Sequence, residues 1–429
     1  MLNFYNLINN KDFKNFSVLS IGAVAANLIP VILQPFLKSL YSPEVFGYFE
    51  IYFRISSILV IFYSLRYDYL IFSAKSSGQL SRHLLFVFCL ITFNFILSLL
   101  ILFFISDFLL LKLNISDNFY FLIWLIPISS FLVACFHLLI FYRTKLSEFL
   151  VIAYSRLLRR LTEGITQLSL GFAGYTDLGL FLGEIIGNFF ATANLRAKKL
   201  YPKRKSLRFL LRYFKKLFIK NTKYPFNKAL PDFLSLFSES IIVILILREF
   251  GIIFVGYLEL SFKILVIPVT IVGAAIAPLI LQKASDAINK RRPVVMELKN
   301  IIIALLSISL IFLLFVTFIL EPIFFVLFDE IWAPSLKFIS ILIYLVCLQL
   351  IISPLGELLI LIDRIAIDAT WKYLKLITLS SLLLFSFDEI NSLVVTYTIT
   401  SSVLYLIYLV LITYFVFRHD KNLGVHQAS

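Results

Sequence analysis

The sequence predicts an all-α polytopic membrane protein, with twelve transmembrane helices in two parallel six-helix repeats, or lobes, around a central cavity. Three observations lead to this fold class: the apolar composition, the distribution of basic residues among the loops, and a repeated segment. Of the 429 residues, 60% are hydrophobic and 15% are charged, whereas about 25% of a soluble domain is charged. A soluble fold of this size has too little interior for so much apolar surface, so lipid must cover it.

The apolar residues form long continuous runs. A helix needs about 20 apolar residues to cross the hydrocarbon core of a bilayer. Continuous runs favour helices over a barrel, whose strands alternate apolar and polar residues over about ten positions. The weakest run carries Glu184 between Gly183 and Gly187. The predicted spans are residues 16–37, 46–73, 84–105, 119–141, 149–175, 178–195, 229–247, 252–281, 301–320, 338–362, 369–387 and 393–417.

The basic residues gather on one side of the predicted membrane. With the N-terminus inside, the cytoplasmic segments hold 28 Lys and Arg residues and the opposite side holds four. Cytoplasmic loops carry such an excess, so both termini are predicted to lie in the cytoplasm. Membrane topology therefore accounts for the formal charge of +14, and no nucleic-acid partner is expected.

The most basic loop, residues 196–228, separates the first six spans from the last six. It holds thirteen basic residues and no acidic residue. Leu210, Phe214 and Leu217 fall on one helical face of it, opposite Arg208 and Arg212, which predicts an interfacial helix on anionic lipid. A solvated linker that only sets topology is the alternative. The predicted division is an N-terminal lobe at 1–195, this loop at 196–228 and a C-terminal lobe at 229–429.

The two halves share a segment at the start of their second helix. Residues 47–54 (GYFEIYFR) and 256–263 (GYLELSFK) have four identical and three conservative positions at an offset of 209 residues. Because each half has an even number of spans, both copies run in the same direction. Parallel repeats of this kind are typical of secondary transporters.

Charged residues inside the predicted spans are the candidate functional residues. A charge at the centre of a membrane helix costs about 2.5–3.5 kcal/mol on insertion scales, so it tends to face a cavity or a partner. In each repeat an acid precedes a base by four residues, a spacing that places Glu50 beside Arg54 and Glu259 beside Lys263. We interpret Arg54 and Lys263 as facing each other across a water-filled cavity that holds an anionic substrate.

Other charged positions have two interpretations each. Arg156 and Arg160 share one face of the fifth helix, where they either line the cavity or extend to the cytoplasmic surface. Arg66 and Asp68 either contribute to the site or form a local pair. The candidate substrate-binding cations are Arg54, Lys263, Arg156, Arg160 and Arg66, and the candidate partner or coupling carboxylates are Glu50, Glu259, Asp68, Glu163 and Asp232.

The cysteines do not suggest a metal site or a disulfide framework. Cys89, Cys135 and Cys347 lie in apolar runs without metal-ligand spacing. We expect ordinary buried thiols, no metal and no cofactor.

Several segments, in order along the chain, resemble those of Wzx-type O-antigen and polysaccharide-unit flippases, which belong to the multidrug/oligosaccharidyl-lipid/polysaccharide exporter (MOP) superfamily. They include residues 40–47 (LYSPEVFG), 65–68 (LRYD), 223–226 (KYPF) and 328–332 (FDEIW). The first span departs from the pattern, because it has no charged residue where the related lipid II flippases carry arginine.

The resemblance implies two six-helix lobes around a V-shaped cavity in the bacterial inner membrane. It implies a flippase that moves undecaprenyl-pyrophosphate-linked oligosaccharide from the cytoplasmic to the periplasmic leaflet by alternating access. A polysaccharide polymerase and a chain-length regulator are the further partners that it suggests.

Two other functions remain open from the sequence. A multidrug or ion-coupled exporter of the same superfamily would have the same fold class. A membrane polysaccharide polymerase is less well supported, because the longest predicted outside loop, residues 321–337, is too short for a catalytic loop. The sequence also contains no Gly-rich phosphate loop, metal-ligand spacing or nucleophile motif, so we do not expect an enzyme.

Overall fold

The computed structural model describes residues 11–113, 119–196, 207–290 and 292–422. Predictions for the two chain ends and for the first part of the basic loop fall on residues 1–10, 423–429 and 197–206, which lie outside the described residues. Within the described ranges every regular element is a helix. These helices form two compact units: unit 1 comprises residues 1–41 and 48–236, and unit 2 comprises residues 42–47 and 237–429. The prediction of an all-α membrane protein is therefore confirmed.

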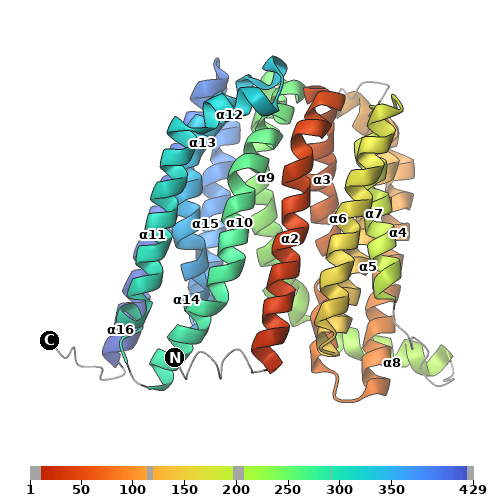
Figure 1. The fold of residues 1–429 in the computed structure, drawn as a ribbon. Coiled ribbons are helices and arrows are strands. Elements are labelled where there is room, and N and C mark those ends of the chain that lie inside the picture. The colour runs from red at the N-terminus through yellow and green to blue at the C-terminus, as the bar shows by residue number, and fades with distance from the viewer. Residues whose placement is uncertain (1–10, 114–118, 197–206, 291, 423–429) are drawn as a thin grey trace. The chain divides into compact units, whose positions relative to one another are not determined.

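Six long helices form the body of unit 1, and they run side by side (Figure 1). The helix α6 packs most extensively against α2 and α7, so the charged residues of α6 lie within the unit. The shorter α8 (Leu207–Lys220) lies across one end of the unit (Figure 1). The long helices are α2 (Lys11–Leu40), α3 (Pro43–Ser64), α4 (Ser77–Leu113), α5 (Leu122–Lys145), α6 (Phe149–Phe172) and α7 (Gly179–Leu195).

Six long helices also form unit 2. A π-helical turn, Pro225–Ala229, precedes the first of them, and this first helix begins in the last residues of unit 1. Two short helices, α12 (Leu320–Leu327) and α14 (Glu357–Leu361), connect longer ones. The long helices are α9 (Leu230–Phe250), α10 (Ile252–Asn289), α11 (Val294–Phe318), α13 (Pro334–Ile352), α15 (Ile365–Ser381) and α16 (Ile390–Asn422).

Not all of the long helices are uniformly apolar. Within the described residues, eight helices are long and apolar enough to cross a membrane. The exceptions include α7 and α15, which have 17 residues each, and α6, whose 24 residues include three arginines and a glutamate. Because charged side chains avoid lipid, the composition of α6 indicates a helix that turns its polar residues toward protein or a cavity.

The structure corrects three predicted segments. The span predicted at 46–73 ends at Ser64, because Leu65 and Arg66 adopt left-handed backbone conformations, with φ of 46° and 58°, and residues 67–73 form a 3-10 helix. The span predicted at 338–362 is interrupted by a 3-10 turn at Ser353–Gly356, where Pro354 lacks the N–H that a continuous α-helix requires. The outside loop predicted at 321–337 contains most of α12. Hydropathy detects an apolar run, but it does not show where the backbone within that run leaves the α-helical conformation.

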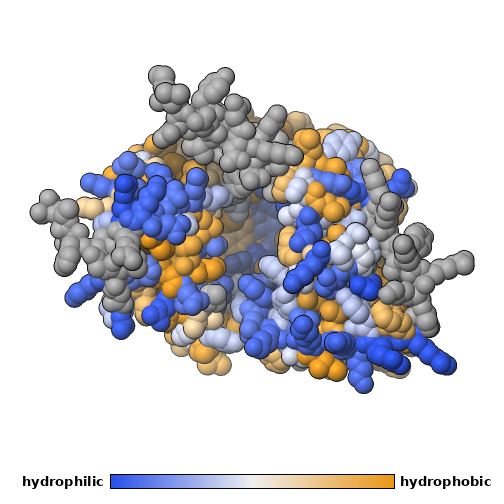
Figure 2. Space-filling view, turned by 90° about the horizontal axis from the view of Figure 1, so that it is seen from below, coloured by the Kyte–Doolittle hydropathy of each residue, from blue (hydrophilic) through white to orange (hydrophobic). Residues whose placement is uncertain are grey.

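The helix α8 packs against the kinked end of α3. Phe214 and Leu217 contact the apolar core of unit 1, and Tyr67 donates a hydrogen bond to the carbonyl of Phe218 (3.3 Å). The guanidinium of Arg82 lies 4.9 Å from the ring centre of Tyr213. Figure 2, seen from below, shows hydrophilic side chains gathered on the end of the molecule that carries α8. Contact of α8 with anionic lipid stays a prediction.

The repeated segments bring two glycines into equivalent contacts. A Cβ atom on Gly47 would collide with the carbonyl oxygen of Ile252, and one on Gly256 would collide with that of Pro43. The two contacts correspond under the 209-residue offset, because Gly256 follows Gly47 and Ile252 follows Pro43 by that number of residues. The first turns of α3 and α10 therefore cross through a pair of glycines, and the sequence repeat corresponds to a structural one.

Replacing Gly256 by alanine is expected to destabilise the protein by about 1–3 kcal/mol, because the new methyl group has no space beside a backbone carbonyl. The matched control is Gly273→Ala on the same helix, where nothing lies within 4 Å of the added atom. Alanine there is expected to stabilise by up to about 1 kcal/mol through its higher helix propensity. Thermal unfolding of the purified variants tests this, and equal melting temperatures would contradict the close crossing.

Candidate functional site

The two acid–base pairs predicted from the repeat are present as ion pairs. Glu50 lies 2.7 Å from Nε of Arg54 in unit 1, and Glu259 lies 3.5 Å from Nζ of Lys263 in unit 2. In each pair the carboxylate is the more buried partner, with a side-chain exposure of 9% and 1%, while the cations are 21% and 30% exposed. Each cation can therefore still reach a ligand while its carboxylate positions it. The predicted substrate role of both cations remains to be tested.

A third cluster forms where α3 ends. Arg66 lies 2.6 Å from Asp232 in the first turn of α9 and 3.9 Å from Asp68. Asp68 is buried in the 3-10 segment between two membrane-spanning helices, and this burial raises the pKa of its carboxyl to about 6, although the charge of Arg66 acts in the opposite direction. The cluster joins three chain segments, which favours the interpretation of Arg66 and Asp68 as a local structural pair.

A polar cavity of about 210 Å³ lies inside unit 1. Three arginines of α6 line it: the spacing of Arg156, Arg159 and Arg160 at i, i+3 and i+4 places them on one face of the helix. The structure thus locates the predicted residues Arg156 and Arg160 in a cavity wall. The remaining lining residues are Ala26 and Asn27 of α2 and Phe136, His137 and Ile140 of α5.

Only part of the positive charge in this cavity is neutralised. Arg160 donates a hydrogen bond to Glu163 (2.9 Å), and Arg159 lies 3.6 Å from Glu184. Among the described residues Arg156 has no carboxylate partner, and the buried Nε of Arg159 has no hydrogen-bond acceptor. Three cations therefore face two carboxylates. An excess of guanidinium charge in a cavity is an arrangement that binds anions.

Glu184 positions Arg159 through a network of hydrogen bonds. Its carboxylate accepts hydrogen bonds from the hydroxyls of Tyr52 and Ser129 and from the side-chain amide of Asn188, each at 2.7 Å. Glu184 itself is 3% exposed. Donors from α3, α5 and α7 thus fix the position of this carboxylate, which in turn holds the guanidinium of Arg159 in place.

Two members of this site are not among the candidate residues predicted from the sequence. One is Arg159, whose spacing from Arg156 places it on the same helical face. The other is Glu184, which lies in the weakest of the predicted spans. The donors Tyr52 and Ser129 carry no signal in the sequence, because they meet Glu184 only when three helices pack together.

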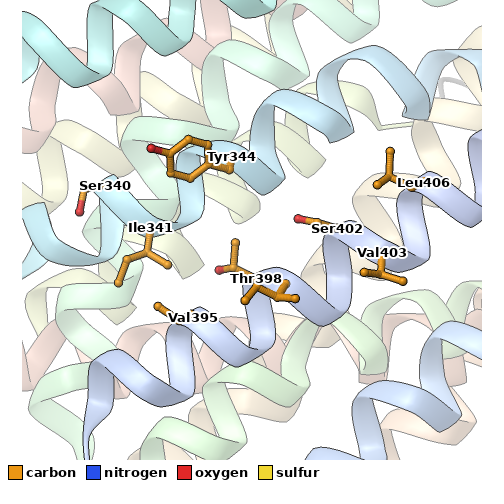
Figure 3. Close-up of a pocket in the computed structure, with 9 residues that line it drawn as sticks. Ser340, Ile341, Tyr344, Val395, Thr398, Ser402, Val403 and Leu406 are labelled. Carbon is orange, nitrogen blue, oxygen red and sulfur yellow. The ribbon is translucent and has the colours of Figure 1, made fainter.

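A second cavity, of about 390 Å³, lies in unit 2 between α13 and α16. Figure 3 shows Tyr344 of α13 and Thr398 of α16 among the residues around it. Its lining contains hydroxyl groups but no charged side chain, so it does not offer a site for an anionic group. The lining residues are Ser340, Ile341, Tyr344, Val395, Thr398, Ile399, Ser402, Val403 and Leu406.

Comparison with known proteins identifies the fold. No protein-family model matches the sequence, and no curated protein matches it. Among solved structures, the lipid II flippase MurJ in an inward closed conformation has a TM-score of 0.69 at 13% identity, covering 95% of this chain and 90% of that one. An inward-facing multidrug resistance transporter of the MATE family and MOP superfamily has a TM-score of 0.61 at 11% identity, covering 95% of both chains. A mutant of the Vibrio cholerae MATE transporter VcmN has a TM-score of 0.59 at 14% identity, covering 97% of both chains.

These similarities extend over nearly the whole chain, and they concern transporters and a flippase rather than enzymes. At such low identity they show the fold alone. They confirm the predicted multi-pass fold class of two six-helix lobes. This chain therefore has the helical two-lobe fold that is shared by the multidrug transporters and the lipid II flippase of the MOP superfamily.

Proposed function

We propose that this chain is a flippase that carries an undecaprenyl-pyrophosphate-linked oligosaccharide, an O-antigen or related repeat unit, from the cytoplasmic to the periplasmic leaflet of the bacterial inner membrane. The observation that supports this most directly is the excess of guanidinium charge in the cavity of unit 1. A pyrophosphate loses its hydration when it leaves water. Fixed guanidinium groups replace that hydration with charge-assisted hydrogen bonds.

The three arginines of the cavity have different roles in this proposal. Arg156, which no described carboxylate neutralises, supplies the net charge for the pyrophosphate. Arg159 and Arg160 are oriented by Glu184 and Glu163 and present their remaining N–H groups. The sugars need a polar surface, while the polyprenyl tail stays in lipid, so only the head group has to be shielded during alternating access.

Arg54 and Lys263 are proposed as the cations that receive the same head group at another stage of transport. Arg66 is a weaker candidate, since Asp232 and Asp68 already neutralise it. A polysaccharide polymerase and its chain-length regulator would consume the product in the periplasm. The anionic lipid of the inner leaflet would bind the basic face of α8.

Export of drugs is the alternative function, and the similarity to MATE transporters supports it. Most of the charge in the described cavity is positive, which disfavours a cationic drug and favours an anionic ligand. Deleting the gene for this protein in its bacterium distinguishes between the two functions. A flippase deletion accumulates lipid-linked repeat units and loses surface polysaccharide, whereas normal surface polysaccharide would contradict our proposal.

Neutralising Arg54 or Lys263 is expected to reduce export by about tenfold or more each, because a hydrogen bond to a charged group contributes about 1.5–3 kcal/mol. The variants are Arg54→Gln and Lys263→Gln. Lys337→Gln, at an exposed position, serves as the matched control. Surface polysaccharide is measured in the complemented deletion strain and normalised to the amount of membrane-inserted protein.

Full complementation by both variants would show that these two cations do not bind substrate. That result would leave the arginine cavity as the binding site, so the flippase proposal would then rest on the variants of Arg156.

A further inference from the structure

The fifth long helix of each unit carries a cation at its eleventh residue. In α6, which begins at Phe149, this residue is Arg159, and in α15, which begins at Ile365, it is Lys375. Both cations lie near aromatic rings and interact with a carboxylate from another helix. They differ in one respect: Arg159 lines the cavity of unit 1, whereas the whole residue Lys375 is only 5% exposed.

Aromatic groups surround the ammonium of Lys375. Its Nζ lies 5.5 Å from the ring centre of Trp371 and 5.3 Å from that of Tyr405. Tyr405, Tyr397 and Glu239 also interact electrostatically with its charge. We call these four residues (Trp371, Tyr397, Tyr405 and Glu239) the ammonium cage. Faces of aromatic rings attract cations, lysine ammonium groups included, and aromatic cages recognise quaternary ammonium ligands.

The cage is built rigidly. The indole N–H of Trp371 donates a hydrogen bond to the carbonyl of Leu404 (3.0 Å), and its ring stacks on Tyr408 at 4.0 Å. These contacts tie one wall of the cage, on α15, to the α16 helix that supplies Tyr397 and Tyr405. Neither contact involves the lysine that fills the cage.

The carboxylates of α15 and α14 near Lys375 have partners of their own. One to two turns along α15, Asp368 pairs with Lys372 (2.7 Å) and accepts a hydrogen bond from Tyr408 (2.7 Å). Glu357 of α14 interacts with that same tyrosine. Glu239 of α9 acts electrostatically on the buried ammonium, and its own side chain is exposed near the middle of that helix.

We propose that the ammonium cage is a monovalent-cation site of unit 2 that the side chain of Lys375 occupies as a tethered ligand. A simple structural ion pair requires only a carboxylate and hydrogen-bond acceptors. Here ring faces supply much of the surroundings, and they suit an alkylammonium group better than a strongly hydrated Na⁺. The ammonium of the lysine permanently provides the positive charge that a dissolved cation would otherwise provide. This unit therefore requires neither Na⁺ nor K⁺ in the cage.

The test empties the cage and refills it with a free ammonium ion. Lys375→Ala removes three methylene groups and the ammonium, which together correspond to n-propylammonium. The purified full-length variant is expected to melt at a lower temperature than the wild type. Addition of n-propylammonium chloride is expected to raise its melting temperature by about 2 °C or more through binding to the folded state. Neither n-propanol nor NaCl at equal concentration should do so, and the wild type should not respond to any of them.

Two further variants identify the groups responsible. Lys375→Met fills the cage without charge, so n-propylammonium should not stabilise it. In the Lys375→Ala/Glu239→Gln double variant the shift should become smaller, because the counter-charge is gone. Equal effects of n-propylammonium and n-propanol on Lys375→Ala, or an equal shift in the wild type, would overturn the proposal.

A second measurement applies if Lys375→Ala does not fold. Glu239→Gln should lower the melting temperature, because it leaves the ammonium without its counter-charge, and adding Lys375→Met to it should recover most of that loss. Additive effects of the two substitutions would overturn the proposal. All of these measurements are independent of the transported substrate, so their failure would not bear on the flippase function.

Discussion

Replacing Arg156 by glutamine should lower export by about ten- to hundredfold while leaving the protein as stable as the wild type. The reduction corresponds to the loss of one or two hydrogen bonds to a charged ligand, at about 1.5–3 kcal/mol each. Stability should not fall, because no described carboxylate is paired with Arg156, so its removal leaves no buried charge without a partner. The measurement is surface polysaccharide in the complemented deletion strain, combined with thermal unfolding of the purified protein.

Arg156→Lys is the matched variant for this prediction. It keeps the charge but loses the planar fork that forms two parallel hydrogen bonds with a phosphate, so export should be intermediate. If Arg156→Gln exports normally, the cavity does not bind the head group. If it instead fails to fold, Arg156 has a structural partner and is not a free cation.

Replacing Glu184 by glutamine should have the opposite pattern, with a large loss of stability of about 3–5 kcal/mol, because the buried guanidinium of Arg159 is left without a counter-charge. The donors from Tyr52, Ser129 and Asn188 would then surround a neutral amide rather than a carboxylate. Chemical or thermal unfolding of the purified variant measures the loss.

The Glu184→Gln/Arg159→Met double variant separates this explanation from a general packing defect. Since it removes both charges, it should recover most of the stability that the single variant loses, although export should remain impaired because a cavity cation is missing. Glu321→Gln, at an exposed carboxylate, is the control and should be neutral. If the double variant loses as much stability as the two single variants together, Arg159 and Glu184 are not energetically coupled.

The two predictions differ because the arginines of α6 have different surroundings. Arg156 has a charge without a described partner, which makes it available to a ligand. Arg159 is held by a carboxylate that three other donors stabilise, which makes it part of the wall. Neighbouring residues of the same type on one helical face thus have separate roles, which their spacing alone does not reveal.

Much of the fold could be predicted because it depends on signals that lie along the chain. Apolar runs determine where helices cross the membrane, and the excess of basic residues on one side predicts which way they point. The match between residues 47–54 and 256–263 identified the repeat, and the contacts of Gly47 and Gly256 give it a structural basis. The pairs Glu50–Arg54 and Glu259–Lys263 were predictable as well, since both members lie one turn apart on a single helix.

The features that could not be predicted arise from contacts between distant segments. The end of α3 at Leu65 and Arg66 is a left-handed reversal within a continuous apolar run, and hydropathy does not detect backbone conformation. The pairing of Arg159 with Glu184 joins α6 to α7, and its donors come from two more helices. Nothing local distinguishes Lys375, which becomes a caged cation only where α15 meets α16.

Composition and charge along the chain are enough to predict the membrane-spanning helices, the two six-helix lobes and the charged residues that lipid would not tolerate. The packing of the helices then sets which of these charges neutralise one another and which remain available to a ligand. Burial and counter-charge depend on distances of a few ångströms between helices, whereas insertion into a membrane depends on composition summed along one helix.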